Sequence, residues 1–144
     1  MKHLLLTTIA AMVLVGCGSP EADYALRSAY DLESAKQAIA DGANVKAKDD
    51  EGWTALHFAQ TKEIAELLIA NGADVNTKDD FGGTPLHNAL GYIEVAEILI
   101  AKGADVNAKY PDGRTLLNYT KGKFADLLRK HGGKTAEELK AEGE

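Results

Sequence analysis

Two histidines and two acidic clusters are the residues of this chain that could form a hydrolytic metal site. His57 and His87 occur in similar sequence contexts, and Asp49-Asp50-Glu51 and Asp79-Asp80 precede them. Imidazole and carboxylate groups could together hold a divalent metal that activates water. An EF-hand, however, needs oxygen ligands spread over about 12 residues and ending in Glu, and the phosphate-binding loop, GxSxG and HExxH motifs are absent as well. We therefore expect no enzyme, no metal and no cofactor, and we expect the acids to solvate the tips of surface loops.

The single cysteine, Cys17, is the other reactive side chain. One cysteine excludes an intramolecular disulfide and a cysteine-based zinc site. It follows a short basic head and the uncharged run 4–15, which at 12 residues is too short for a membrane-spanning helix of about 20. Such a run is typical of a secretory signal peptide.

The sequence Leu14-Val15-Gly16-Cys17 resembles the lipobox of bacterial lipoproteins. The resemblance implies cleavage between Gly16 and Cys17, a lipidated Cys17 with two or three acyl chains, and stable attachment to a membrane. Residues 1–16 would then be the signal peptide and residues 17–20 the lipidated cysteine and linker. Because Gly18 is not the Asp that retains such proteins in the inner membrane, we expect an outer-membrane anchor facing the periplasm of the bacterial cell envelope. Ordinary secretion is the alternative, since Gly16 and Gly18 also fit a small-x-small cleavage pattern.

The remainder of the chain repeats every 30 or 31 residues. Residues 63–69 and 94–100 have the apolar periodicity of amphipathic helices. Gly72 and Gly103 follow these helices directly and suit the left-handed position that ends a helix. Each unit is thus expected to contain one long helix that must pack against its neighbours in a solenoid.

A second, shorter helix is expected in each unit after a capping threonine. Thr54 and Thr84 stand at this position, and Pro85 follows Thr84 at the first helical turn. The run Thr84-Pro85-Leu86-His87-Asn88-Ala89 matches the ankyrin signature Thr-Pro-Leu-His-x-Ala, and 54–59 departs from it only at Ala55. The chain therefore resembles the ankyrin repeat family, in which this histidine is a structural hydrogen-bonding residue.

The resemblance implies an all-α repeat solenoid of about four short ankyrin repeats, each a helix-turn-helix unit with an extended loop or β-hairpin finger. The units are shorter than the family's usual 33 residues, so we expect shortened inner helices. The repeat domain would cover residues 21–133, with repeats one to four at about 21–48, 49–78, 79–109 and 110–133. Residues 134–144 would form a C-terminal capping helix or tail, because Thr135 and Glu138 fit a capping box.

Because the sequence lacks the motifs of an enzyme, binding of another protein is the function that remains. The formal net charge of −6 disfavours nucleic acid as a partner, and acidic loop tips favour a neutral or basic protein. We expect a monomer that acts as a membrane-tethered scaffold for an unknown protein partner; the alternative is an inhibitor or immunity-type protein that blocks a toxin or envelope enzyme. The candidate partner-binding residues are the aromatic, Arg and Asn side chains near the tips and inner helices: Trp53, Phe58, Phe81, Asn88, Tyr92, Tyr110, Arg114 and Tyr119.

Overall fold

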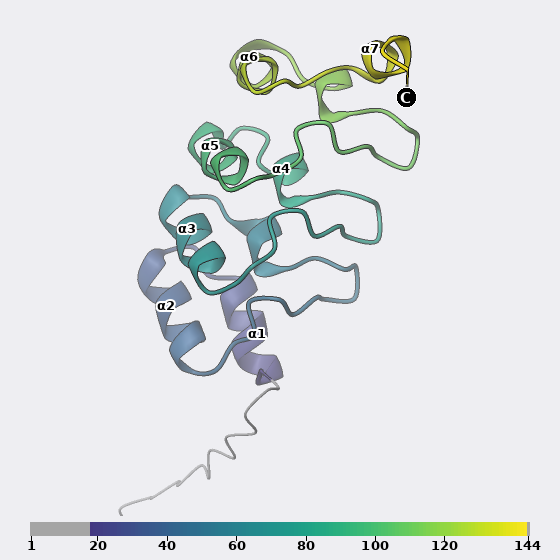
Figure 1. The fold of residues 1–144 in the computed structure, drawn as a ribbon. Coiled ribbons are helices and arrows are strands. Elements are labelled where there is room, and N and C mark those ends of the chain that lie inside the picture. The colour runs from purple at the N-terminus through teal and green to yellow at the C-terminus, as the bar shows by residue number, and fades with distance from the viewer. Residues whose placement is uncertain (1–17, 144) are drawn as a thin grey trace, which may run out of the picture.

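The helices of this chain stack in pairs into one elongated array. The computed structural model describes residues 18–143. In chain order the helices are α1 (Pro20–Arg27), α2 (Leu32–Ala40), η1 (Ala55–Phe58), α3 (Lys62–Ala70), α4 (Pro85–Asn88), α5 (Ile93–Ala101), η2 (Leu116–Asn118), α6 (Gly122–Lys130) and α7 (Ala136–Ala141). Figure 1 shows α2, α3, α5 and α6 along one side of the stack and long loops projecting from the other side. Residues 18–143 contain no β-strand, only one isolated bridge between Lys109 and Thr115, so the expected all-α repeat array is confirmed.

The long outer helix of each pair ends at a glycine. Gly72 has a φ of 94° after α3, in the left-handed region that residues with a Cβ avoid. Its N–H donates to the carbonyl of Ile69, and the N–H of Ala73 donates to the carbonyl of Leu68, each at 3.0 Å. Gly103 has the same φ after α5. These bonds satisfy the last carbonyls of the helix and turn the chain toward the next repeat.

The inner helices are short, as the repeat length predicted. The helix η1 has four residues, α4 has four and η2 has three. Only α1 of the first repeat is longer, with eight residues. A single turn cannot be stable by itself, so these inner turns depend on the neighbouring repeats.

The core is a set of columns in which each repeat contributes the same position. Leucines of the inner turns and of the outer helices fill two columns, and alanines of the outer helices fill a third. All nine side chains are at most 7% exposed: Leu56, Leu86, Leu117, Leu68, Leu99, Leu128, Ala35, Ala65 and Ala96. Small alanines let the inner turns lie close to the outer helices, while the leucines fill the space between repeats.

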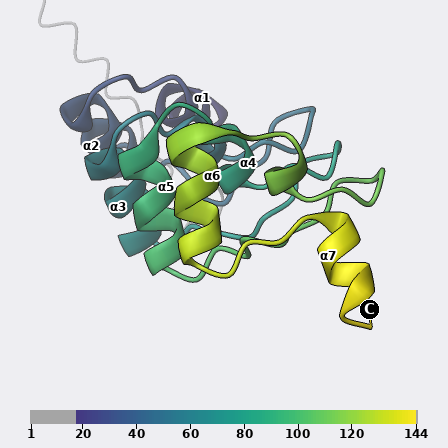
Figure 2. The ribbon, with the colours of Figure 1, turned by 90° about the horizontal axis from the view of Figure 1, so that it is seen from above.

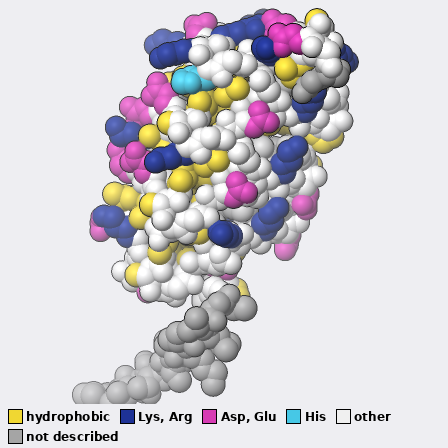
Figure 3. Space-filling view, viewed as in Figure 1, with side chains coloured by type: hydrophobic (Ala, Val, Ile, Leu, Met, Phe, Trp, Pro, Cys, Tyr) yellow, Lys and Arg dark blue, Asp and Glu magenta, His cyan; other side chains and the backbone are white. Residues whose placement is uncertain are grey.

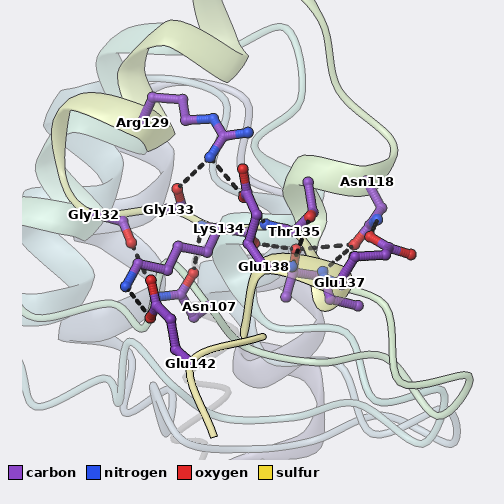
Figure 4. Close-up of polar contacts among 12 residues, drawn as sticks. Asn107, Asn118, Arg129, Gly132, Gly133, Lys134, Thr135, Glu137, Glu138 and Glu142 are labelled. Atoms are coloured by element: carbon purple, nitrogen blue, oxygen red, sulfur yellow. Dashed lines mark hydrogen bonds and ion pairs between the residues drawn. The ribbon is translucent and has the colours of Figure 1, made fainter. Parts of the chain in front are cut away.

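Helix α7 closes the C-terminal end of the array. Figure 2 shows it on the same side of α6 as the projecting loops. Asn118 of η2 accepts the N–H of Ala136 at 3.0 Å and donates to the carboxylate of Glu137 at 2.9 Å. The hydroxyl of Thr115 donates to the carbonyl of Lys134 at 2.6 Å. Helix α7, through these polar contacts and its buried Ala136 and Leu139, therefore takes the place of a fifth repeat (Figure 4).

Asparagines in the loops after the outer helices join successive repeats. The side chain of Asn76 donates to the carbonyl of Gly103 and accepts the N–H of Asp105, at 3.0 and 2.8 Å. Asn107 makes the same pair of bonds to the segment before α7, at 3.1 and 2.8 Å (Figure 4). Each asparagine thus satisfies two backbone groups of the following unit.

Candidate protein-binding face

The first two loops that project from the array are held by carboxylates that accept hydrogen bonds from the backbone of their own turn. We call residues 46–53, 76–83 and 107–114 the finger loops. Asp79 is only 8% exposed, and its carboxylate accepts the N–H groups of Phe81 and Gly83, each at 2.8 Å. Half-buried Asp49 makes the same two bonds in the preceding finger loop, at 3.0 and 2.9 Å. The expectation that these acids solvate the tips was therefore wrong for Asp79, which is buried, whereas Asp49 shapes its own turn and remains partly exposed.

His57 and His87 lie where the finger loops meet the inner helices, and each is 4% exposed. The Nδ1 atom of each ring accepts the backbone N–H of the capping Thr54 or Thr84 at 3.0 Å. The Nε2 atom of His57 donates to the carbonyl of Gly83 in the next repeat, at 3.4 Å. Burial lowers the pKa of both histidines, that of His87 to about 4. At neutral pH both rings are thus uncharged hydrogen-bonding groups that hold the inner turns in place.

The same two histidines do not belong to an assembled ligand set. Within the range 18–143, no three His, Cys, Asp or Glu side chains are grouped so that they could hold a metal ion. The Nδ1 atoms are already occupied by the capping threonines.

A groove of about 350 Å³ lies across the inner helices of repeats two and three. It is lined by Trp53, His57, Phe58, Ala59, Gln60, His87, Asn88, Leu90 and Tyr92. The half-buried ring of Trp53 packs against Phe58, with ring centroids 5.0 Å apart, and stacks at 6.5 Å on His57. Leu90 is 46% exposed and Tyr92 is 39% exposed at the rim. The groove therefore has an aromatic wall beside accessible apolar side chains.

A second hollow of about 380 Å³ lies in repeat four and is lined by Tyr110, Pro111, Asp112 and Tyr119. The hydroxyl of Tyr119 donates to the carboxylate of Asp112, and the guanidinium of Arg114 lies 5.8 Å from the Tyr119 ring centroid. Tyr110 meets the Tyr119 ring edge-on at 5.5 Å and the His87 ring at 4.2 Å. Tyr110 thus contacts one residue that lines the groove, His87, and one that lines the second hollow, Tyr119.

The outside of the array carries both signs of charge. Figure 3 shows hydrophobic side chains in patches between acidic and basic ones on the face seen in Figure 1. Such mixed surfaces are ordinary, so the grouped aromatic side chains of the groove are the distinguishing feature.

Residues 23–110 match the family model for ankyrin repeats in three copies. The chain belongs to the ankyrin repeat family. A comparison with curated proteins found no significant match. Ankyrin repeat domains are generally non-catalytic binding modules, and the family suggests a scaffold for protein–protein interaction.

The ankyrin fold brings most of the candidate partner-binding residues together in two places. The groove contains Trp53, Phe58, Asn88 and Tyr92, and the second hollow contains Tyr110 and Tyr119 with Arg114 beside them. Phe81 is 61% exposed in the second finger loop and lines neither of them.

Sequence reasoning missed five of the lining residues: Ala59, Gln60, Leu90, Pro111 and Asp112. Leu90 follows the matched ankyrin motif directly and precedes Gly91, where the shortened inner helix has already ended. A leucine at that point has no helical turn to direct it to the core, and this was the signal that could have identified it. Asp112 could have been found from its place in a finger loop close to Tyr119.

The predicted signal peptide and lipobox, including Cys17, lie outside the described residues. The description begins with Gly18, and none of the helices in residues 18–143 is long and apolar enough to cross a membrane.

Proposed function

We propose that this chain is a lipoprotein of the bacterial envelope whose ankyrin repeats bind a partner protein in the groove. The observation that carries this proposal is the exposure of Leu90 and Tyr92 beside the aromatic pair of Trp53 and Phe58. Aromatic anchors next to accessible apolar surface are typical of the centre of a protein interface.

The net charge of the chain favours a neutral or basic partner. Exposed acids (Asp50, Glu51, Asp80) and exposed lysines (Lys46, Lys48, Lys78) balance in the first two finger loops, but the whole chain has a formal net charge of −6. A chain with net negative charge attracts a partner of opposite charge and disfavours an acidic one.

A lipid on Cys17 would hold this binding module at a membrane. The proposal rests on the lipobox sequence 14–17 and on the apolar run before it. Two or three acyl chains on one residue suffice for stable anchoring. Gly18 in place of Asp favours the outer membrane, with the repeats in the periplasm.

Crosslinking in intact envelopes, followed by mass spectrometry, tests the groove. The double variant Leu90→Ser, Tyr92→Ala should reduce the captured partner at least tenfold, because losing two anchors typically costs more than about 1.4 kcal/mol. Both side chains are well exposed, so the thermal melt should change little. Tyr24→Ala is the matched control, since Tyr24 is 68% exposed outside the groove. An undiminished yield from the double variant would reject the groove as the binding site.

Labelling with a palmitate analogue tests the anchor. The natural chain should incorporate label and float with membranes, whereas Cys17→Ala should do neither. Label retained on the Cys17→Ala variant would place the lipid elsewhere.

A further inference from the structure

Two carboxamide side chains in the groove have no hydrogen-bond partner within residues 18–143. This range contains eight carboxamides, six of asparagine and two of glutamine. Six of the eight bond to other groups of the chain: Gln37, Asn44, Asn71, Asn76, Asn107 and Asn118. The other two, Gln60 and Asn88, make no such bond in the described part of the chain, and both line the groove. The free carboxamides of the array are thus found together in one place.

Asn88 stands where the neighbouring repeats have aromatic side chains. At the same position of the inner turn, repeat two has Phe58 and repeat four has Tyr119. Each of these aromatic rings packs on another ring of its own repeat. Asn88 is half-buried as well, but its amide is free. Because a polar group that loses water without gaining a partner costs free energy, this position suits a ligand that brings its own hydrogen-bonding groups.

The free amides favour an extended main chain as the occupant of the groove. A carboxamide offers N–H donors and a carbonyl acceptor, which complement the C=O and N–H of a peptide backbone. A helix uses its backbone groups internally, so a bound helix would leave Asn88 unpaired. Addition of a strand to a sheet edge needs a sheet, and residues 18–143 contain no β-strand. An extended segment keeps its N–H and C=O groups free and alternates its side chains, so it can pair with the amides while one side chain enters the groove.

We propose that the groove binds an extended segment of the partner protein, whose backbone pairs with the carboxamide of Asn88. This inference rests on the proposed function, in which the groove is the site for a partner. An apolar side chain of the segment lies against the exposed Leu90 and Tyr92. Two stacked repeats, at about 8–10 Å each, are spanned by roughly six residues of extended chain at about 3.3 Å per residue. The net charge of −6 disfavours acidic residues in the segment.

Selection of phage-displayed random peptides of about 12 residues on the purified full chain tests this inference. The natural chain should enrich a common sequence with a central apolar residue, and the Leu90→Ser, Tyr92→Ala double variant should not. The probe is then the synthetic peptide of that sequence. Its binding is measured by the emission of Trp53, the single tryptophan of the chain, which lines the groove.

Substitution of Asn88 separates backbone pairing from apolar contact. Asn88→Ala should weaken binding of the peptide about fivefold, which is the loss expected for one hydrogen bond. The fold should stay intact, because the same position holds Phe58 and Tyr119 in other repeats. Asn71→Ala is the matched control and should change the affinity less than about twofold. Asn71 is exposed outside the groove, and its amide donates to the carbonyl of Leu67 at 2.8 Å.

Methylation of the peptide backbone identifies the bond itself. An N-methyl group removes one N–H donor of the peptide and leaves its side chains unchanged. At one central position it should weaken binding to the natural chain about fivefold and have little further effect on binding to Asn88→Ala. The two changes are not additive because they remove the same hydrogen bond.

The outcomes separate this inference from the proposed function. Failure to enrich any linear peptide, or equal affinity of the peptide for the natural chain and Asn88→Ala, would overturn the extended segment. Crosslinking in intact envelopes could then still show the groove to be the site for a folded partner. Undiminished capture by the Leu90→Ser, Tyr92→Ala variant would instead reject the groove, and this inference with it.

Discussion

Acidification from pH 7 to pH 5 should destabilise this fold through His87. Burial lowers the pKa of His87 to about 4 in the folded chain, whereas an unfolded histidine has a pKa of about 6.5. Between these values the unfolded chain binds a proton that the folded chain does not. The contribution of uncharged, buried His87 to the free energy of unfolding is therefore fully present above about pH 6.5. It is lost as the pH falls toward 4.

The size of the effect follows from these two values. A difference of about 2.5 pKa units corresponds to about 3 kcal/mol when the titration is complete, and about 2 kcal/mol of this is lost between pH 7 and pH 5. His57 contributes in the same direction, because burial lowers its pKa too. Carboxylates add little above pH 5, since their ordinary pKa values are near 4.

The chain itself supplies the control substitution. Asn118 of repeat four accepts the N–H of Thr115 at 3.0 Å, as His87 accepts the N–H of Thr84 at the same distance. His87→Asn should therefore keep the capping bond without carrying a titratable group. Urea unfolding of a lipid-free form, followed by the fluorescence of Trp53, gives the free energy of unfolding at each pH.

The expected result is that His87→Asn loses about 2 kcal/mol less than the natural chain between pH 7 and pH 5. Lower stability of the variant at pH 7, from the lost contact with Tyr110, does not affect this difference. An identical pH dependence of variant and natural chain would refute the reasoning.

Three further substitutions test the packing of the array. Leu99→Ala removes a side chain that is 0% exposed and should lower the free energy of unfolding by about 2–5 kcal/mol in urea titration; a loss below about 1 kcal/mol would contradict the packed column. Asn107→Ala removes both hydrogen bonds to the segment before α7, so amide exchange should accelerate in α7 and remain slow in α3; uniform acceleration would argue against a local role. Gly103→Ala places a Cβ on a residue with a φ of 94°, which should cost about 1 kcal/mol of folding free energy and lower the melting temperature by several degrees. An unchanged melting temperature would show that the turn can relax.

The helices and the family could be predicted because their signals are local. The periodicity of 63–69 lies within α3, and Gly72 ends that helix in the left-handed conformation. The short spacing after Thr54 predicted a shortened inner helix, and η1 is a single turn. Each of these features depends on neighbours in the chain, so one sequence contains the information.

The binding face could be predicted only in part. Aromatic residues near the inner helices were selected by type, and Trp53 and Tyr92 do meet in one groove. Leu90 was missed because its exposure depends on where a one-turn helix ends. Asp79 was misassigned, because a carboxylate in a loop is buried only when the loop folds back over it.

By itself the sequence determined the repeat, its period, the ends of the long helices and the lipobox pattern around Cys17. Only the tertiary structure decided which face of the array is hollowed, that α7 replaces a fifth repeat, and that Gly18 is packed against repeat one. The division has a physical cause. Caps, turns and periodicity are set within a few residues, whereas grooves and close contacts form between segments that stacking brings together from 20 or more residues apart, as for Asp23 and Asn44.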